Sequence, residues 1–150
     1  MNRNLAPPPF NLPYPGHPLG NLIRGWIHRH VLIRISRIYR LYFRPDLQYL
    51  VDDGVIPLPF NLVLKFSPHA REAEGIAMSL ARSMGIPAPR FISYGEHFPN
   101  TSSRQGSILM TRIPGKTLQD VIESLSPEEL HVIMQELAGL LDRMRSYSNP

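Results

Sequence analysis

The chain has 150 residues, 43% of them hydrophobic, a length and composition suited to one folded domain with its own core. It contains no cysteine, which excludes disulfides, thiolate metal sites and cysteine nucleophiles. The net charge of +4 is unevenly placed, because the first 50 residues hold seven arginines and a single acidic residue, Asp46. No apolar run approaches the roughly 20 residues that span a bilayer, and no secretory signal pattern is present, so we expect a cytoplasmic protein.

The N-terminal third divides into two segments. Residues 1–20 hold six prolines and no periodic apolar face, which predicts a flexible arm. Residues 21–44 predict a basic amphipathic helix, whose apolar stripe recurs at spacings of three and four: Ile23, Trp26, Ile27, Val31, Ile35, Ile38 and Tyr42. We expect this stripe to pack on the domain and the arginines to face water. Alternatively, the helix binds an anionic membrane or a nucleic acid.

The middle of the chain alternates between strands and one helix. Strands are predicted over residues 47–51, 61–66, 91–94 and 107–112, with a polar loop over 98–106. In the second strand Leu62, Leu64 and Phe66 share one face, and Val63 and Lys65 share the other. A helix is predicted over residues 70–84, capped by Gly85, with an apolar stripe made of Ala73, Ile76, Ala77, Leu80 and Ala81.

Two helix-start signals follow near the C-terminus. Thr117 and Asp120 match a capping box, and Ser126 with Glu129 matches a second one that has a proline in its first turn. The second signal opens a helix predicted over residues 127–145. Its apolar face consists of Leu130, Ile133, Met134, Leu137, Leu140, Leu141 and Met144.

Lys65 is the first residue with a chemical interpretation. It is one of only two lysines, and it lies within an apolar strand, where an ammonium group needs an anionic partner. The following helix offers Glu72 and Glu74. A strand lysine that pairs with a helix carboxylate is how kinases hold nucleotide phosphates. The alternative is that Lys65 extends from a strand edge into water.

The segment SILMTRIPG, residues 107–115, is the second such feature. A strand that ends in a proline–glycine break leaves backbone groups outside any ladder, where they can hydrogen-bond a flat heterocycle such as adenine. The alternative is an edge strand that runs into a linker. The six histidines form no metal-ligand pattern, and no serine has the context of a hydrolase nucleophile.

These features occur in an order that resembles the aminoglycoside phosphotransferase family, and more narrowly its fungal branch. The matching stretches run from Leu58 onward and are LPFNLVLKF, EAEGIAMSLARSMGIPAPR, YGEH, SILMTRIPG and LLDRMRSYSNP. The resemblance implies an α+β fold of the protein-kinase type. Residues 45–115 would form its small lobe, an antiparallel sheet plus a helix with the hinge, and residues 116–150 would begin the larger lobe.

The resemblance also implies roles for individual residues. Lys65 would contact the α- and β-phosphates of ATP, and Glu74 would orient it, with Glu72 as the second choice. Met110–Ile113 matches the hinge, where the Thr111 carbonyl and the Ile113 amide would hold adenine. The implied reaction is phosphoryl transfer from ATP to a hydroxyl group of a small molecule whose identity the sequence does not give.

The sequence departs from the family pattern in two places. No glycine-rich GxGxxG motif precedes Lys65, and neither the HGD-type catalytic loop nor the aspartate motif that binds magnesium occurs before Pro150. We therefore expect a truncated family member that does not catalyse transfer alone, with Mg²⁺ only in the complete enzyme. We also expect self-association through the helix at 127–145. Alternatives are a non-catalytic nucleotide- or protein-binding module, or a basic-helix protein that binds membranes or nucleic acid.

Overall fold

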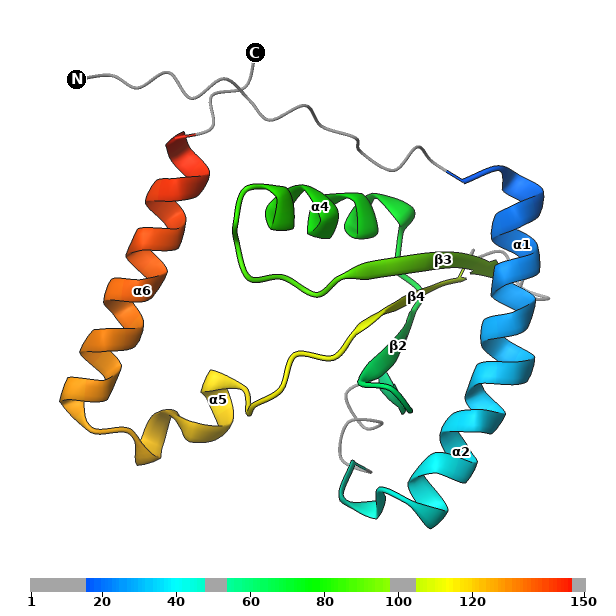
Figure 1. Ribbon diagram of the computed structural model, residues 1–150, viewed down its shortest axis with the longest axis horizontal. Helices are drawn as coiled ribbons and strands as arrows, with labels where there is room; N and C mark the ends of the chain where they lie inside the picture. The colour runs from blue at the N-terminus through cyan, green and yellow to red at the C-terminus, as the bar shows by residue number, and fades with distance from the viewer. Residues whose placement is uncertain (1–15, 48–53, 98–104, 147–150) are drawn as a thin grey trace.

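The computed structural model describes residues 16–47, 54–97 and 105–146, and within them the chain is an α+β structure. A four-stranded antiparallel sheet of order β1-β2-β4-β3 lies at its centre, with helices on both faces (Figure 1). The α+β class with an antiparallel sheet, which the resemblance implies, is thus confirmed.

The strands are β1 (Val55–Leu58), β2 (Leu62–Ser67), β3 (Phe91–His97) and β4 (Gln105–Thr111). The two central strands, β2 and β4, supply the hydrophobic core residues with no exposed surface, Leu64 and Ile108. The ring of Phe66 packs at a tilt against His97 on one face of the sheet, whereas Lys65 reaches Glu74 on the other. The predicted alternation of side chains along β2 is therefore confirmed, and each face of the sheet is covered by a different helix.

The first predicted strand, over residues 47–51, is not supported where it can be checked. Leu47 closes a short 3-10 helix, η2 (Pro45–Leu47), and residues 48–51 lie outside the described residues. The edge of the sheet is instead β1, which contains Pro57 and turns into β2 through Pro59–Asn61. Proline is tolerated at a sheet edge, where its missing N–H faces no partner strand.

A long N-terminal helical rod covers one face of the sheet (Figure 1). It consists of α1 (Pro18–Ile27), a π-helical turn η1 (His28–Leu32) and α2 (Ile33–Tyr42). The rod begins at Pro18, inside the segment 1–20 predicted to be a flexible arm, because proline suits the first turn of a helix. The rest of that arm, residues 1–15, is outside the described residues. Pro45 follows the end of the rod, where its ring would clash with a further helical turn.

The rod packs on the sheet through small and polar residues, which corrects the sequence prediction. Its buried residues are Asn21, Gly25, His28 and Ser36. The apolar stripe that was expected to face the domain is exposed instead, all seven members included: Ile23, Trp26, Ile27, Val31, Ile35, Ile38 and Tyr42. In a regular α-helix Ser36 would lie roughly 80° around the axis from His28. The wider π turn between them brings both onto the buried side.

Two glycines explain why this side of the rod is the one that docks. At Gly25 an added Cβ would overlap the backbone carbonyl of Glu96, and at Gly95 it would lie 2.7 Å from the Gly25 Cα. The backbones of α1 and β3 therefore touch, and only glycine permits this approach. Hydrophobic periodicity gives no weight to glycine, so the stripe of large apolar residues predicted the wrong face.

The opposite face of the sheet carries α4 (Glu72–Ser83), which Gly85 caps with φ +73° as predicted. Gly75 is the buried residue of this helix and lies against the ring of Phe91. Two members of the predicted apolar stripe, Ala73 and Ala77, are exposed. The helix therefore docks through its glycine side, rotated from the side that the alanines indicated.

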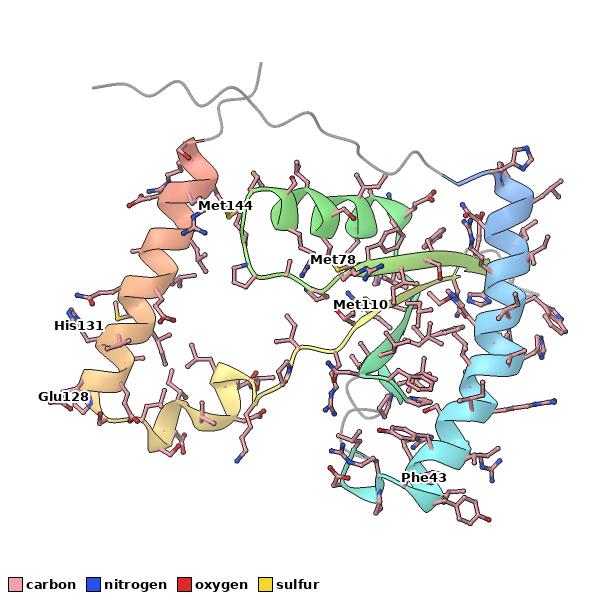
Figure 2. The ribbon with its side chains drawn as sticks, in the orientation of Figure 1. Phe43, Met78, Met110, Glu128, His131 and Met144 are labelled. Atoms are coloured by element: carbon pink, nitrogen blue, oxygen red, sulfur yellow. The ribbon has the colours of Figure 1, made fainter. Side chains whose placement is uncertain are left out.

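The C-terminal part contains α5 (Leu118–Val121), η3 (Ile122–Ser124) and α6 (Pro127–Ser146). Both predicted capping boxes are present: Thr117 and Asp120 cap each other, as do Ser126 and Glu129. The long helix α6 has no buried residue, and Figure 2 places Glu128, His131 and Met144 along it, away from the sheet. Within the described residues, no helix has the length and apolarity needed to cross a bilayer.

Candidate functional site

The sheet presents two faces of different character, which we name by the helices that cover them. The α1 face carries Leu64, Phe66 and Ser107 and is covered by the N-terminal rod. The α4 face carries one cross-strand row of Val55, Lys65, Ile108 and Tyr94, and next to it the row of Pro57, Val63, Met110 and Phe91. Of the predicted site residues, Lys65, Glu74 and Met110 lie on the α4 face, whereas Thr111 pairs with Leu62 and so lies on the α1 face.

Lys65 and Glu74 form the ion pair that the sequence predicted. The Lys65 ammonium donates to Glu74 Oε1 at 2.5 Å, with both side chains a little more than one-third exposed. The pair is held by β2 and by the first turns of α4, two elements that are joined by a short turn. An ammonium group on a strand thus has its carboxylate partner and still faces solvent, where an anionic ligand can reach it.

Glu72, the second choice for this role, has a different function in the structure. Its carboxylate accepts from the Gly16 amide at 2.7 Å and from Asn21 Nδ2 at 3.3 Å. It therefore joins the start of α4 to the start of α1 and does not contact Lys65. Two residues, about half a helical turn, separate Glu72 from Glu74, so their carboxylates point to different sides of α4.

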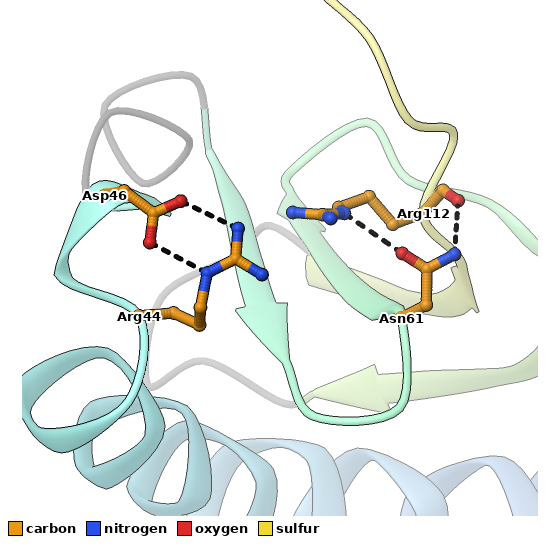
Figure 3. A network of polar contacts seen from close by, with 4 residues as sticks. All are labelled: Arg44, Asp46, Asn61 and Arg112. Atoms are coloured by element: carbon orange, nitrogen blue, oxygen red, sulfur yellow. Dashed lines mark hydrogen bonds and ion pairs between the residues drawn. The ribbon is translucent and has the colours of Figure 1, made fainter.

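The predicted hinge lies at the end of β4, next to the turn between β1 and β2. Arg112 is fixed there by Asn61: its amide donates to the Asn61 carbonyl at 2.8 Å, and its Nε donates to Asn61 Oδ1 at 3.1 Å (Figure 3). The side-chain Nδ2 of Asn61 donates to the Arg112 carbonyl at 3.1 Å. This arrangement holds the segment that leaves β4 at a fixed place beside β2.

The three residues predicted to contact adenine differ in their surroundings. Met110, labelled on β4 in Figure 2, pairs with Val63 and is half-buried. Thr111 is engaged with β3, since its amide donates to the Arg90 carbonyl and its hydroxyl accepts from the Arg90 amide. The Ile113 amide has no hydrogen-bond partner among the described residues, and the Ile113 side chain is exposed. Ile113 is therefore the hinge residue with a backbone donor open to a ligand.

The α1 face contains a buried polar cluster that was not predicted from the sequence. His28 Nδ1 lies 2.7 Å from Ser107 Oγ, His28 Nε2 lies 3.0 Å from Ser93 Oγ, and His97 Nε2 lies 2.8 Å from the same Ser107 oxygen. Burial, together with the nearby His97 and Arg24, lowers the pKa of His28 to about 4. Burial also lowers the pKa of His97, with contributions from Arg29 and His30.

These histidines are structural, since both rings and Ser107 lie in the interface between the rod and the sheet. A neutral His28 that donates from Nδ1 to Ser107 and accepts at Nε2 from Ser93 satisfies the polar atoms of its ring. No group of three or more histidine, aspartate or glutamate side chains in the described part of the chain is placed to hold a metal ion. A signal for the cluster existed in the spacing of Asn21, Gly25 and His28, which puts small and polar residues on one side of a helix.

Two surface hollows lie on the rod and away from Lys65. One, of about 340 Å³, is lined by the apolar residues Ile35, Ile38, Tyr39, Phe43 and Pro59. The other, of about 270 Å³, is lined by Leu22, Trp26, Arg29, His30, Glu96 and His97. Neither hollow is lined by Lys65 or Glu74, so a ligand at Lys65 would be held by the ion pair and the hinge backbone.

Comparison of the chain with protein-family models, with curated proteins and with solved structures finds no match. The functional argument therefore depends on the geometry of the α4 face. Its partly exposed ammonium group, held by one carboxylate, is suited to bind a phosphate group. The open amide of Ile113, on the strand-end segment of the same sheet, is suited to bind a hydrogen-bond acceptor.

Proposed function

We propose that this chain is the nucleotide-binding part of a kinase-like phosphotransferase related to the aminoglycoside phosphotransferase family. The observation that carries the proposal is the ion pair between Lys65 on a central strand and Glu74 on the helix that follows it. Kinases use this pairing to hold the lysine against the phosphates of ATP. The order of a lysine strand, a glutamate helix, two further strands and a hinge also supports a kinase-like small lobe.

In this proposal each residue has a defined part. Lys65 donates to the α- and β-phosphates of ATP, and Glu74 limits the positions that the lysine side chain adopts. Met110 provides an apolar contact for the adenine ring, while the Thr111 carbonyl and the Ile113 amide hydrogen-bond its edge. Asn61 keeps the hinge in place through its bonds to Arg112. The family's catalytic aspartate and magnesium ligands have no matching motif in this sequence, so these residues are assigned nucleotide binding.

The acceptor in the proposed reaction is a hydroxyl group of a small molecule, as the resemblance implies. We place the activity in the cytoplasm, where ATP is available and where a chain without cysteine needs no oxidising environment. In the complete enzyme, Mg²⁺ would neutralise charge on the phosphates of the bound ATP, as metal ions do in kinases.

The proposal is tested by titrating the 150-residue chain with ATP and Mg²⁺ in a calorimeter. A lost hydrogen bond to a charged group costs about 1.5–3 kcal/mol, so Lys65→Ala is expected to weaken binding by roughly ten- to a hundredfold. Arg145→Ala is the matched control, because it removes one positive charge from an exposed position at the end of α6. Equal affinities of wild type and Lys65→Ala would refute the assignment.

Two glutamate variants distinguish an effect on nucleotide binding from an effect on the stability of the fold. Glu74→Gln removes the partner of Lys65 and is expected to weaken nucleotide binding with little change in stability, because the pair is partly exposed. Glu72→Gln is expected to lower stability, since Glu72 anchors the start of the rod, and to leave the affinity of the folded protein unchanged. The reverse pattern would assign the phosphate-binding role to Glu72.

A further inference from the structure

The N-terminal rod carries an exposed apolar surface that nothing in the described residues covers. Its strongly exposed members are Leu19, Ile23, Trp26, Ile38, Leu41, Tyr42 and Phe43, with exposed fractions from 55% to 78%. All but Phe43, which follows the end of α2, lie along the side of α1 and α2 that is turned away from the buried Asn21, Gly25, His28 and Ser36. We call this surface the outer face of the rod.

This distribution is the reverse of what a helix that only covers a sheet requires. Such a helix buries its large apolar side chains and exposes its polar ones. Here the polar and small residues are buried in specific contacts, for example the Ser36 hydroxyl that donates to the Pro57 carbonyl at 2.6 Å. The fold therefore does not explain why these apolar side chains are exposed. They form one extended surface, whereas the exposed apolar residues of ordinary protein surfaces are scattered singly.

The charge of the rod indicates what the outer face binds. Between Pro18 and Tyr42 the rod has five arginines and no acidic residue. Arg29, Arg34 and Arg37 are exposed and form no ion pair with any other described residue. Basic side chains beside exposed Trp, Leu and Ile are the composition of helices that lie in the interface of an anionic bilayer.

The same charge argues against a second copy of the rod as the occupant. A symmetric dimer through the outer face would bring Arg29, Arg34 and Arg37 of both copies close together, and none of the three has a counter-charge among the described residues. An anionic lipid surface supplies that counter-charge and also accepts the apolar side chains. The apolar groove lined by Ile35, Ile38, Tyr39, Phe43 and Pro59 adds a recess at the α2 end, beside the same surface.

We propose that the outer face of the rod docks the protein onto the surface of an anionic membrane. The rod lies in the plane of the interface, with Trp26 and its apolar neighbours among the headgroups and the arginines toward the lipid phosphates. This inference does not depend on the proposed nucleotide function, because it uses the opposite side of the sheet.

The experiment measures partition of the 150-residue chain to vesicles of phosphatidylcholine with and without about 30% phosphatidylserine. Binding is expected only with the anionic lipid, and it should weaken as the salt concentration rises from about 0.1 to 0.5 M. Because Trp26 is the only tryptophan, its fluorescence reports the rod directly and should shift to shorter wavelength on binding.

Three variants give the test its specificity. The triple substitution Ile23→Ser, Trp26→Ser and Leu41→Ser removes exposed apolar side chains and should abolish co-sedimentation. Neutralising Arg29, Arg34 and Arg37 with glutamine should weaken binding at least tenfold, given about fivefold for each basic residue near the surface. The matched control, Val132→Ser, Met134→Ser and Leu137→Ser, alters equally exposed residues of α6 and should bind as wild type.

Several outcomes overturn the proposal. Equal binding to neutral and anionic vesicles, or equal losses in the rod variant and the α6 control, would remove the outer face as a lipid site. A fluorescence shift without vesicles that grows with protein concentration, together with a dimer in sedimentation, would assign the surface to protein contact. Tighter binding to RNA or DNA than to vesicles would assign the arginines to nucleic acid.

Discussion

The buried histidine cluster makes the stability of the fold dependent on pH. His28 is 2% exposed between the rod and the sheet, and its pKa in the folded state is about 4 instead of 6.5. The unfolded chain therefore takes up a proton more readily than the folded chain. The contribution of His28 to stability is complete above pH 6.5 and is lost as the pH falls toward 4.

The size of this effect follows from the shift in pKa. Each unit of pKa difference corresponds to about 1.4 kcal/mol, so the free energy of unfolding should fall by about 2 kcal/mol between pH 7.5 and 5. At pH 4 the loss reaches about 3 kcal/mol. His97 adds a loss of the same sign, because its pKa is lowered as well. These are large fractions of the stability of a small domain.

The assay is urea unfolding followed by circular dichroism at pH 7.5 and pH 5. In His28→Gln the pH dependence should shrink by about 2 kcal/mol, because the glutamine does not titrate in this range. His131→Gln, at an exposed position on α6, should keep the dependence of the wild type. Equal pH dependence in wild type and His28→Gln would refute the reasoning.

If His28→Gln does not fold, an NMR titration of the wild-type imidazole resonances replaces it. A His28 midpoint near 6.5 in the folded protein would mean that the ring is not held neutral. The acid sensitivity would then come from another group.

Further predictions concern close backbone approach and helix capping, and each is checked by thermal unfolding. Gly25→Ala should lower stability by about 2 kcal/mol or more, because its Cβ meets the rigid backbone of Glu96. Gly139→Ala, which meets no atom within 4 Å on α6, should instead raise stability by up to about 1 kcal/mol, and a similar loss at both sites would contradict the packing argument. Ser126→Ala should cost about 1 kcal/mol, because it removes the hydroxyl that caps the Glu129 amide, and an unchanged midpoint would show that α6 does not need this cap.

Features set by local chemistry were predictable from the sequence. The two capping boxes, the cap at Gly85 and the strand alternation around Lys65 depend on residues within a few positions of each other. The pairing of Lys65 with a glutamate was predictable for the same reason, since one turn separates β2 from α4. Predictions from such local patterns are correct when the tertiary contacts favour the same local structure.

The face by which each helix docks was not predictable from apolar periodicity. The rod turns its isoleucines outward, and α4 turns Ala73 and Ala77 outward, because in both cases a glycine allows the closest approach to the sheet. Only the resemblance ranked Glu74 above Glu72, because the residue types alone leave this choice open. It depends on the rod reaching the start of α4, a contact between residues 56 positions apart.

The two proposed ligands belong to opposite sides of one sheet, and this gives a joint test. Lys65 projects from the α4 face, whereas Trp26 lies on the side of the rod that points away from the α1 face. A bilayer against the rod would therefore leave the nucleotide face open to solvent. We expect Lys65→Ala to bind anionic vesicles as wild type does, and the serine variant of the rod to keep wild-type affinity for ATP.

Interfaces on separate faces act independently when the sheet between them is rigid. A variant that combines the substitutions should therefore lose ATP affinity as Lys65→Ala does and vesicle binding as the serine variant of the rod does. The core strands β2 and β4 provide that rigidity through the fully buried Leu64 and Ile108. If either substitution removes both activities while circular dichroism shows an intact fold, one surface binds both ligands. In that case the assignment of the lipid to the outer face, or of the nucleotide to the α4 face, is wrong.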